Sequence, residues 1–173
     1  MEDNKYSLGL RIMHWLMAVF IIGMLCSGFY MKSLPVSNEF KFSMYTIHKA
    51  CGVTVFGLVV IRILFRASTC IPPLPASFSR FEINISKTVH LGLYALMILV
   101  PLSGYVMSSA SGREIKYFFH IPLLISKNKE LASAANGLHS ILAYFIVFFI
   151  VLHILAALKH TLIDKQNIFK RII

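Results

Sequence analysis

Four long apolar stretches separated by polar segments divide the chain. They cover residues 10–31, 45–65, 89–108 and 138–158. Each is close to the ~20 residues that an α-helix needs to cross about 30 Å of bilayer hydrocarbon. Because the stretches and their short connections use up the sequence, we expect residues 1–173 to form one membrane domain. Its expected fold is all-α, an integral membrane four-helix up-down bundle.

The three connecting segments differ in character. Residues 32–44 are short and polar. Residues 66–88 contain three closely spaced prolines at 71–75, where missing backbone N–H groups and fixed φ angles exclude a helix. Residues 109–137 form the longest connection, and within them the stretch 126–135 indicates a short surface helix.

The composition agrees with a protein surrounded by membrane lipid. Hydrophobic residues make up 57% of the chain and charged residues only 14%, against about 25% charged residues in a typical soluble domain. The formal net charge is +10, which raises the question of nucleic-acid binding. We expect no nucleic acid, because the basic residues flank the apolar stretches and form no stripe or tail.

The distribution of Lys and Arg predicts the orientation. In an up-down bundle, ten of them fall on the side of the termini and seven on the other side. Basic residues favour the cytoplasmic side, so both termini are expected in the cytoplasm. The opposite side is still unusually basic, with Lys32, Lys41, Lys49, Arg113, Lys116, Lys127 and Lys129.

Several kinds of chemistry are disfavoured by what the apolar stretches lack. No Asp or Glu lies within them, whereas proton-coupled transporters usually place a carboxylate inside the membrane. No nucleophile, base and orienting group form a hydrolytic set. Cys26, Cys51 and Cys70 form no C-x-x-C-H motif, which excludes a covalently attached c-type haem.

Histidines are the remaining candidates for chemistry, and six of the seven lie in or at the ends of the apolar stretches; His120 lies in a loop. His139 and His153 are 14 residues apart, which places them on nearly the same helix face with a rise of ~21 Å. In an up-down bundle His14 is level with His153, and His48 is level with His139. His14 and His48 lie at opposite faces of the membrane and cannot pair.

Two histidines at each of two levels favour haem over a bare metal ion. Zinc and copper sites need three or four ligands that converge on one point. A haem supplies four nitrogens itself and asks the protein for one or two axial ligands. Two imidazoles fill both axial positions, which favours electron transfer over oxygen activation.

On each of the other three expected helices, we counted 14 residues on from the first histidine. The count leads from His14 to Gly28, from His48 to Arg62 and from His90 to Gly104. Glycine at the level of a macrocycle lets the flat ring approach the backbone, although glycine also serves close helix packing. Arg62 is placed to neutralise a haem propionate; the alternative is that it extends to the membrane surface.

Four short motifs, one on each expected helix, are distinctive. They are Arg-Ile-Met-His-Trp-Leu at 11–16, Ile-His-Lys-Ala-Cys-Gly at 47–52, His-Leu-Gly-Leu-Tyr at 90–94 with Pro-Leu-Ser-Gly at 101–104, and Leu-His at 138–139 continuing through His153 to Lys-His at 159–160. Together they resemble the bacterial cytochrome b561 family over essentially the whole chain. The chain is more distantly similar to membrane cytochrome b subunits of hydrogenases and formate dehydrogenases.

The resemblance implies two b haems in the core of the bundle, in a multi-pass protein of the bacterial inner membrane. It implies that His14 and His153 bind the iron of the inner haem, and that His48 and His139 bind the iron of the outer one. Members of the family are linked to ubiquinone and to superoxide:ubiquinone oxidoreductase activity.

Two further histidines match family positions near the cytoplasmic haem. The resemblance implies that His90 and His160 line a quinone pocket, with the alternative that His90 is the true inner ligand. The sequence leaves the oligomeric state open, including a homo-oligomer.

The expected function is a transmembrane di-haem electron carrier that oxidises superoxide at the periplasmic haem and reduces ubiquinone near the cytoplasmic haem. The seven outer basic residues face only three outer carboxylates, and such a field steers a small anion; ordinary loop charge or contact with anionic lipid is the alternative. The competing functions are a cytochrome b membrane subunit of a multi-subunit dehydrogenase or hydrogenase, and a histidine-based metal transporter.

Overall fold

The apolar stretches form four long helices in a computed structural model, which describes residues 5–75, 77–119 and 121–173. In chain order the elements are α1 (Leu8–Ser33), α2 (Glu39–Ser68), α3 (Arg80–Ala110), α4 (Lys129–Leu158), a π-helix η1 (Lys159–Ile163) and a 3-10 helix η2 (Ile168–Arg171). No other helix and no strand occurs among the described residues, apart from one isolated β-bridge. The fold is therefore all-α, as predicted.

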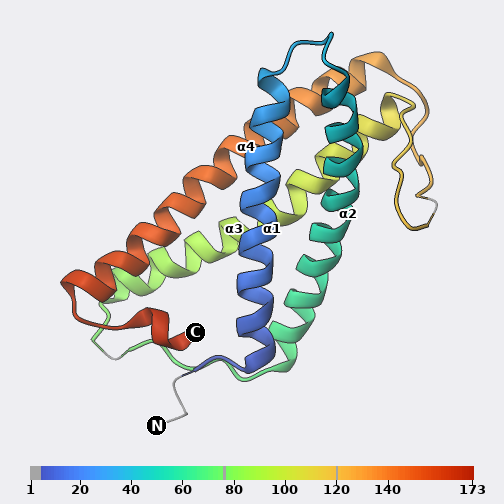
Figure 1. Cartoon of the computed structure of the whole chain (residues 1–173). Helices are drawn as coiled ribbons and strands as arrows, with labels where there is room; N and C mark the ends of the chain where they lie inside the picture. Colours follow the sequence, from blue (N-terminus) through green and yellow to red (C-terminus); the bar gives the residue numbers. More distant parts are fainter. Residues whose placement is uncertain (1–4, 76, 120) are drawn as a thin grey trace.

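The helices run up and down, so the bundle has two distinct ends (Figure 1). The backbone N–H of Tyr6 donates to the carbonyl of Arg171 at 3.0 Å, which joins the beginning and the end of the described chain. We call this end, with residues 69–79 between α2 and α3, the terminus end. The opposite end carries residues 34–38, 111–119 and 121–128 and is called the loop end.

Polar caps extend the helices beyond the apolar stretches. The side chain of Asn38 accepts a hydrogen bond from the N–H of Phe40 at the start of α2. Ser79 and Glu82 form a capping box at the start of α3. Such caps satisfy N–H groups that have no partner within the helix, so helix α3 begins nine residues before the apolar stretch that starts at residue 89.

The expected separate surface helix at residues 126–135 is wrong. Asn128 caps α4 by accepting a hydrogen bond from the N–H of Leu131, and the helix then continues from Lys129 to Leu158 without a break. No proline interrupts this segment, so its polar first turns join the apolar helix. The stretch 71–75 is not helical, as its prolines predict.

The helices pack α1 on α2, α2 on α3 and α3 on α4. A small core of Met17, Val55 and Val59 holds α1 against α2 about midway between the two ends. Helices α3 and α4 approach closely where Gly92 faces the ring of Phe149, in space that a β-carbon would fill. Small residues at such contacts are typical of membrane helices, because association there depends on close packing.

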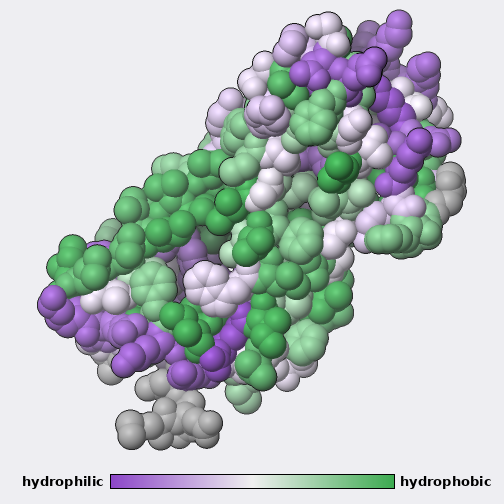
Figure 2. Space-filling model, viewed as in Figure 1, coloured by the Kyte–Doolittle hydropathy of each residue, from purple (hydrophilic) through white to green (hydrophobic). Residues whose placement is uncertain are grey.

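The outside of the bundle is apolar along its length. All four long helices are long and apolar enough to cross a membrane, and many large apolar side chains on them are exposed. Figure 2 shows hydrophobic side chains over the middle of the molecule and hydrophilic ones gathered toward its two ends. An apolar surface of this kind is suited to contact with the hydrocarbon core of a lipid bilayer. The protein is therefore a multi-pass membrane protein.

The long connection that follows α3 is held against the neighbouring helices. The hydroxyl of Tyr117 lies 3.0 Å from that of Thr54 on α2. Tyr105 on α3 donates its hydroxyl proton to the carbonyl of Pro122 at 2.7 Å. These contacts hold the connection against the middle of α2 and against α3.

Candidate functional site

The loop end of the bundle brings His48 of α2 and His139 of α4 together. Their ring centroids are 6.3 Å apart, with ring planes at 81°. An imidazole nitrogen binds a metal at about 2 Å, so two imidazoles on opposite sides of one metal have centroids roughly 6 Å apart. The observed separation fits such an arrangement.

Both rings at the loop end are oriented through Nδ1. His139 Nδ1 lies 2.9 Å from the carbonyl oxygen of Val100 and 3.0 Å from the hydroxyl of Ser103. A carbonyl only accepts, so Nδ1 carries the ring proton and leaves the lone pair of Nε2 for a metal. His48 Nδ1 is 3.2 Å from the hydroxyl of Ser27.

Two glycines make room for these rings. A β-carbon on Gly104 would lie 3.2 Å from Cε1 of His139, tighter than ordinary contact, and one on Gly28 would lie 3.4 Å from Cε1 of His48. The structure thus places both glycines at the loop end, each against an imidazole. A side chain at Gly104 would displace the ring of His139, whereas the contact at Gly28 is at the edge of the ordinary range.

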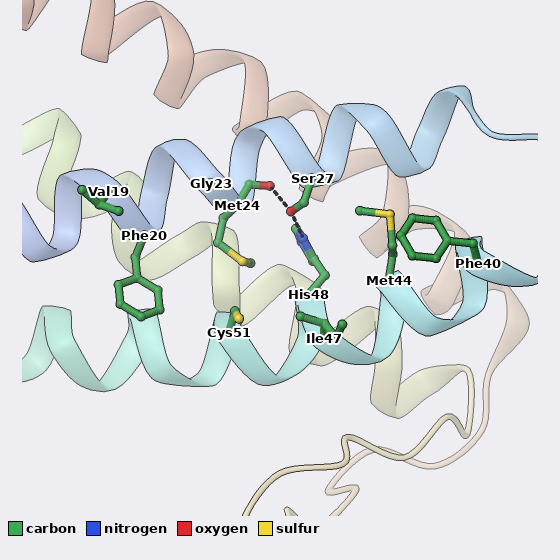
Figure 3. A pocket seen from close by; sticks show the side chains of 10 residues that line it. All are labelled: Val19, Phe20, Gly23, Met24, Ser27, Phe40, Met44, Ile47, His48 and Cys51. Atoms are coloured by element: carbon green, nitrogen blue, oxygen red, sulfur yellow. Dashed lines mark hydrogen bonds between the residues drawn. The ribbon is translucent and has the colours of Figure 1, made fainter.

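An apolar groove of about 370 Å³ lies beside His48, between α1 and α2. Figure 3 shows His48 directed toward Ser27, with Phe20, Met24 and Met44 along the same groove. The surroundings of this imidazole are therefore largely apolar, which suits a neutral ligand.

Three histidines meet toward the terminus end. The rings of His14 on α1 and His153 on α4 have centroids 6.1 Å apart. His90 on α3 approaches His153 edge to face at 5.2 Å, and its Nδ1 donates to the carbonyl of Ser86 at 2.6 Å. The separation of His14 and His153 fits a metal between two imidazoles, whereas His90 lies closer to the ring of His153 than that geometry requires.

Arg62 of α2 lies beside this histidine group. One terminal nitrogen donates to the carbonyl of Leu10 at 3.0 Å, and Nε donates to the hydroxyl of Tyr94 at 3.2 Å. The other terminal nitrogen is 3.5 Å from Nδ1 of His14. These partners come from α1 and α3, so the guanidinium is fixed at the junction of three helices.

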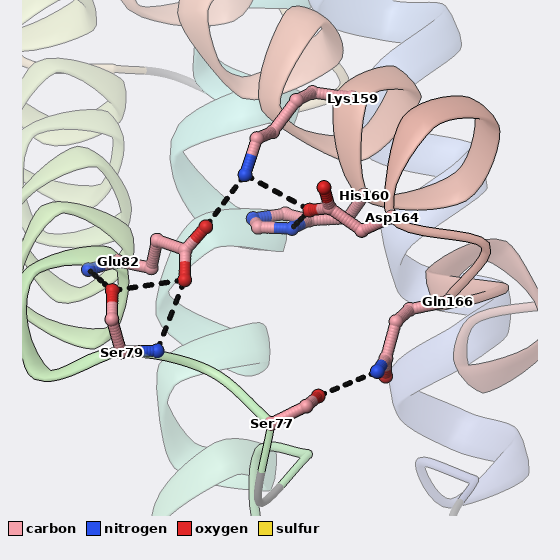
Figure 4. Close-up of polar contacts among 7 residues, drawn as sticks. All are labelled: Ser77, Ser79, Glu82, Lys159, His160, Asp164 and Gln166. Atoms are coloured by element: carbon pink, nitrogen blue, oxygen red, sulfur yellow. Dashed lines mark hydrogen bonds and ion pairs between the residues drawn. The ribbon is translucent and has the colours of Figure 1, made fainter.

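His160 does not join the other histidines but belongs to a polar cluster at the terminus end (Figure 4). Its Nδ1 is 2.7 Å from Asp164, and its ring stacks on Phe78. Lys159 contacts both Glu82 at 2.6 Å and Asp164 at 2.9 Å.

The Lys159 ammonium holds the pKa of the Asp164 carboxyl below its ordinary value. Although Glu82, His160 and Asp164 could together hold a metal ion by their spacing, Lys159 already supplies a cation to both carboxylates. The cluster is best described as a clasp between α3 and the end of α4.

The expected site residues thus divide into three groups. His48 and His139 meet with Gly28 and Gly104 at the loop end; His14, His153, His90 and Arg62 meet toward the terminus end; and His160 stands in the clasp. His120 lies outside the described residues.

The orienting partners Ser27, Ser103 and Tyr94 were not singled out as site residues by the sequence. Ser103 and Tyr94 stand inside the motifs at 101–104 and 90–94, and Ser27 precedes Gly28. A hydroxyl one turn after His90, or directly before a glycine at the level of an expected haem, is the signal that could have found them.

Known proteins provide an independent comparison. The family model described as Prokaryotic cytochrome b561 matches residues 5–173. Cytochrome b561 homolog 2 of Escherichia coli (strain K12) is 33% identical over 173 residues, which cover 98% of this chain and 92% of that protein. The protein named Probable superoxide oxidase CybB of Yersinia pestis is 28% identical over 169 residues, which cover 97% of this chain and 95% of that protein. With a family model matching almost the whole chain, the protein belongs to the prokaryotic cytochrome b561 family of membrane electron-transfer proteins.

Proposed function

We propose that this protein is a transmembrane di-haem b electron carrier that oxidises superoxide at its loop end and reduces ubiquinone near its terminus end. One observation carries the proposal. Helix α4 offers two histidines at two levels, and each has a partner histidine from another helix at 6.3 Å or 6.1 Å. Both separations suit a metal between two imidazoles.

His48 and His139 would hold one haem, and His14 and His153 the other. The closer edge-to-face contact of His90 with His153 favours His14 as the second ligand. A haem held by two imidazoles supplies a one-electron centre with no open coordination position. The protein contributes the orientation of the rings, through Ser103 and the carbonyl of Val100 at the loop end.

The proposed orientation places the termini in the cytoplasm of a bacterial inner membrane. It rests on the excess of Lys and Arg on the side of the termini. The loop end then faces the periplasm, with basic side chains on α1, α2 and the 111–128 connection. A positive field at this end would raise the arrival rate of a small anion, and one relative is named as a probable superoxide oxidase.

The overall reaction balances without a catalytic base at the loop end. Each superoxide gives up one electron and leaves as dioxygen. Two electrons and two cytoplasmic protons convert ubiquinone to ubiquinol. We place the quinone near His90 and the clasp residue His160. Both imidazoles lie toward the terminus end, from which the protons come, and their ring nitrogens can hydrogen-bond to a quinone oxygen.

The test is superoxide-dependent formation of ubiquinol by the purified holoprotein in lipid vesicles that contain ubiquinone. Superoxide is generated outside the vesicles, and ubiquinol is extracted and quantified. We expect ubiquinol formation by the wild type that decreases with ionic strength, because salt screens the attraction of the anion. Loss of ubiquinol formation is expected for His139→Ala but not for Arg80→Gln, a change at an exposed residue of the terminus end.

Two results would contradict the proposal. Haems that dithionite reduces but superoxide does not would instead support a cytochrome b subunit that needs a dehydrogenase partner. A protein without haem that binds metal ions would support the histidine-based transporter.

A further inference from the structure

The two histidine groups differ sharply in their electrostatic surroundings. Toward the terminus end, Arg62 interacts electrostatically with His14, His90 and His153. The polar atoms that hydrogen-bond to the His48 and His139 rings at the loop end belong to Ser27, Ser103 and Val100 and carry no charge. A guanidinium therefore lies 3.5 Å from an imidazole nitrogen at the terminus-end level, whereas the hydrogen-bond partners of the loop-end imidazoles are neutral.

The charge of Arg62 is held in place and is not cancelled by a neighbour. Its hydrogen bonds to the Leu10 carbonyl and the Tyr94 hydroxyl come from helices α1 and α3, so the guanidinium cannot turn away freely. Both partners are neutral. Within the part of the chain that the structure describes, Arg62 forms no ion pair with an Asp or Glu side chain.

Arg66 adds to the asymmetry one turn further along α2. Its guanidinium lies 6.0 Å from the ring centre of Tyr94 and interacts electrostatically with His90. Its effect on the His14–His153 pair is expected to be smaller than that of Arg62, which lies 3.5 Å from His14 Nδ1.

We propose that Arg62 is a positioning residue that raises the reduction potential of the terminus-end haem above that of the loop-end haem. Electrons then flow from the loop end to the terminus end. The inference rests on the proposed di-haem function and adds to it an order of the two reduction potentials and the residue that sets this order. Reduction adds one negative charge between the imidazoles, and a nearby fixed cation stabilises the reduced form more strongly in a low-dielectric interior than in water.

The same sign results if Arg62 also pairs with an acidic group of the haem. Removing the guanidinium then leaves that negative charge without a partner, which again disfavours the added electron. The direction of the effect therefore does not depend on how the acidic groups of the haem are oriented.

The experiment is a potentiometric titration of the purified holoprotein, followed through the haem absorption bands. For the wild type we expect two one-electron waves. His48→Ala, which removes a loop-end ligand, should keep the wave of higher potential. Arg62→Gln should lower the midpoint potential of that wave. We expect the reduction equilibrium to change by about tenfold or more, which is equivalent to about 59 mV for one electron.

Three further variants separate charge from structure. Arg62→Lys keeps the charge and should retain most of the wild-type potential. Arg66→Gln should shift the same wave by less than Arg62→Gln does. Arg80→Gln, at an exposed position of the same end, should leave both waves unchanged.

The outcomes distinguish this inference from the proposed function. A wild-type protein without two haems would overturn the di-haem function, and the inference with it. If the protein holds two haems, two results would overturn the inference alone. One is loss of the wave of higher potential in His48→Ala, and the other is a pair of potentials that do not change in Arg62→Gln. If Arg62→Gln fails to keep the terminus-end haem, the His48→Ala titration still decides the order of the potentials.

Discussion

Single atoms decide whether the loop-end imidazoles can take their positions. Gly104 leaves only enough room for the ring of His139, and a β-carbon would lie 3.2 Å from Cε1 and 3.4 Å from Nδ1. Because Nδ1 is the atom that bonds to Val100 and Ser103, displacement of the ring would also disturb its orientation. The site therefore depends on a residue that has no side chain.

We predict that Gly104→Ala lowers the content of loop-end haem more than Gly28→Ala does. The β-carbon of Gly28→Ala would meet His48 at 3.4 Å, a contact that a small shift relieves. Haem per chain in the purified variants is the measurement. Gly57→Ala is the control, since no atom lies within 4 Å of its added β-carbon. Equal haem content in Gly104→Ala and Gly57→Ala would contradict the prediction.

At the scale of residues, the sequence predicted which histidines share a level but not how their rings are held. The 14-residue interval between His139 and His153 follows from helix geometry alone. The hydrogen bond from His139 to the Val100 carbonyl depends on how α3 rotates against α4, which no local pattern determines. For the same reason the sequence did not predict that Arg62 hydrogen-bonds to Leu10 and Tyr94 of two other helices, and its contact with a haem propionate stays a prediction.

At the scale of elements, apolar stretches reveal where helices cross the membrane but not where they end. The stretches at 45–65 and 89–108 lie inside the longer helices Glu39–Ser68 and Arg80–Ala110. The additional turns mix polar and apolar residues, and polar caps at Asn38 and Ser79 stabilise their first N–H groups. Hydropathy alone therefore predicted that residues 129–135 belong to a separate helix. In the structure they are the first turns of α4.

The clasp predicts a specific pH dependence of stability. Lys159 lowers the folded-state pKa of Asp164 below its ordinary value of 3.8. A carboxyl group whose pKa is lowered on folding stabilises the protein at pH values above its unfolded pKa, and this stability is lost as the pH falls through the folded pKa. The contribution of Asp164 should therefore be present at neutral pH and fade below about pH 4.

The measurement is the Tm of the wild type and of Asp164→Asn as the pH is lowered. We expect the wild type to have the higher Tm at neutral pH, by a small margin because the group is exposed. The two Tm values should converge below about pH 4. A difference that stays constant down to acid pH would show that the Asp164 charge plays no part in the clasp. Arg80→Gln serves as the control variant.

At the scale of the whole molecule, an even number of crossings places both termini on one side. The connection between α2 and α3 lies on that side too, and it contains the exposed Cys70. The proposed orientation, which rests on the distribution of Lys and Arg, has this side facing the cytoplasm. With Cys26 and Cys51 replaced by serine, Cys70 becomes a single reporter of orientation.

We predict that a membrane-impermeant maleimide labels Cys70 only after the cells are opened. A second reporter, Ser126→Cys in a protein without other cysteines, should be labelled in intact spheroplasts, because Ser126 is exposed in the 111–128 connection at the loop end. The opposite pattern would reverse the orientation and place the basic loop end in the cytoplasm, away from periplasmic superoxide.

Two haems, held at two levels by four histidines, are the basis of the proposed electron transfer. The most direct measurement is haem per chain by the pyridine haemochrome method, together with a reduced-minus-oxidised visible spectrum of the purified protein. We predict two b haems with low-spin bands, and one haem in each of His139→Ala and His14→Ala. One haem in the wild type would show that one histidine pair is wrongly assigned, and no haem after expression with adequate haem supply would contradict the account.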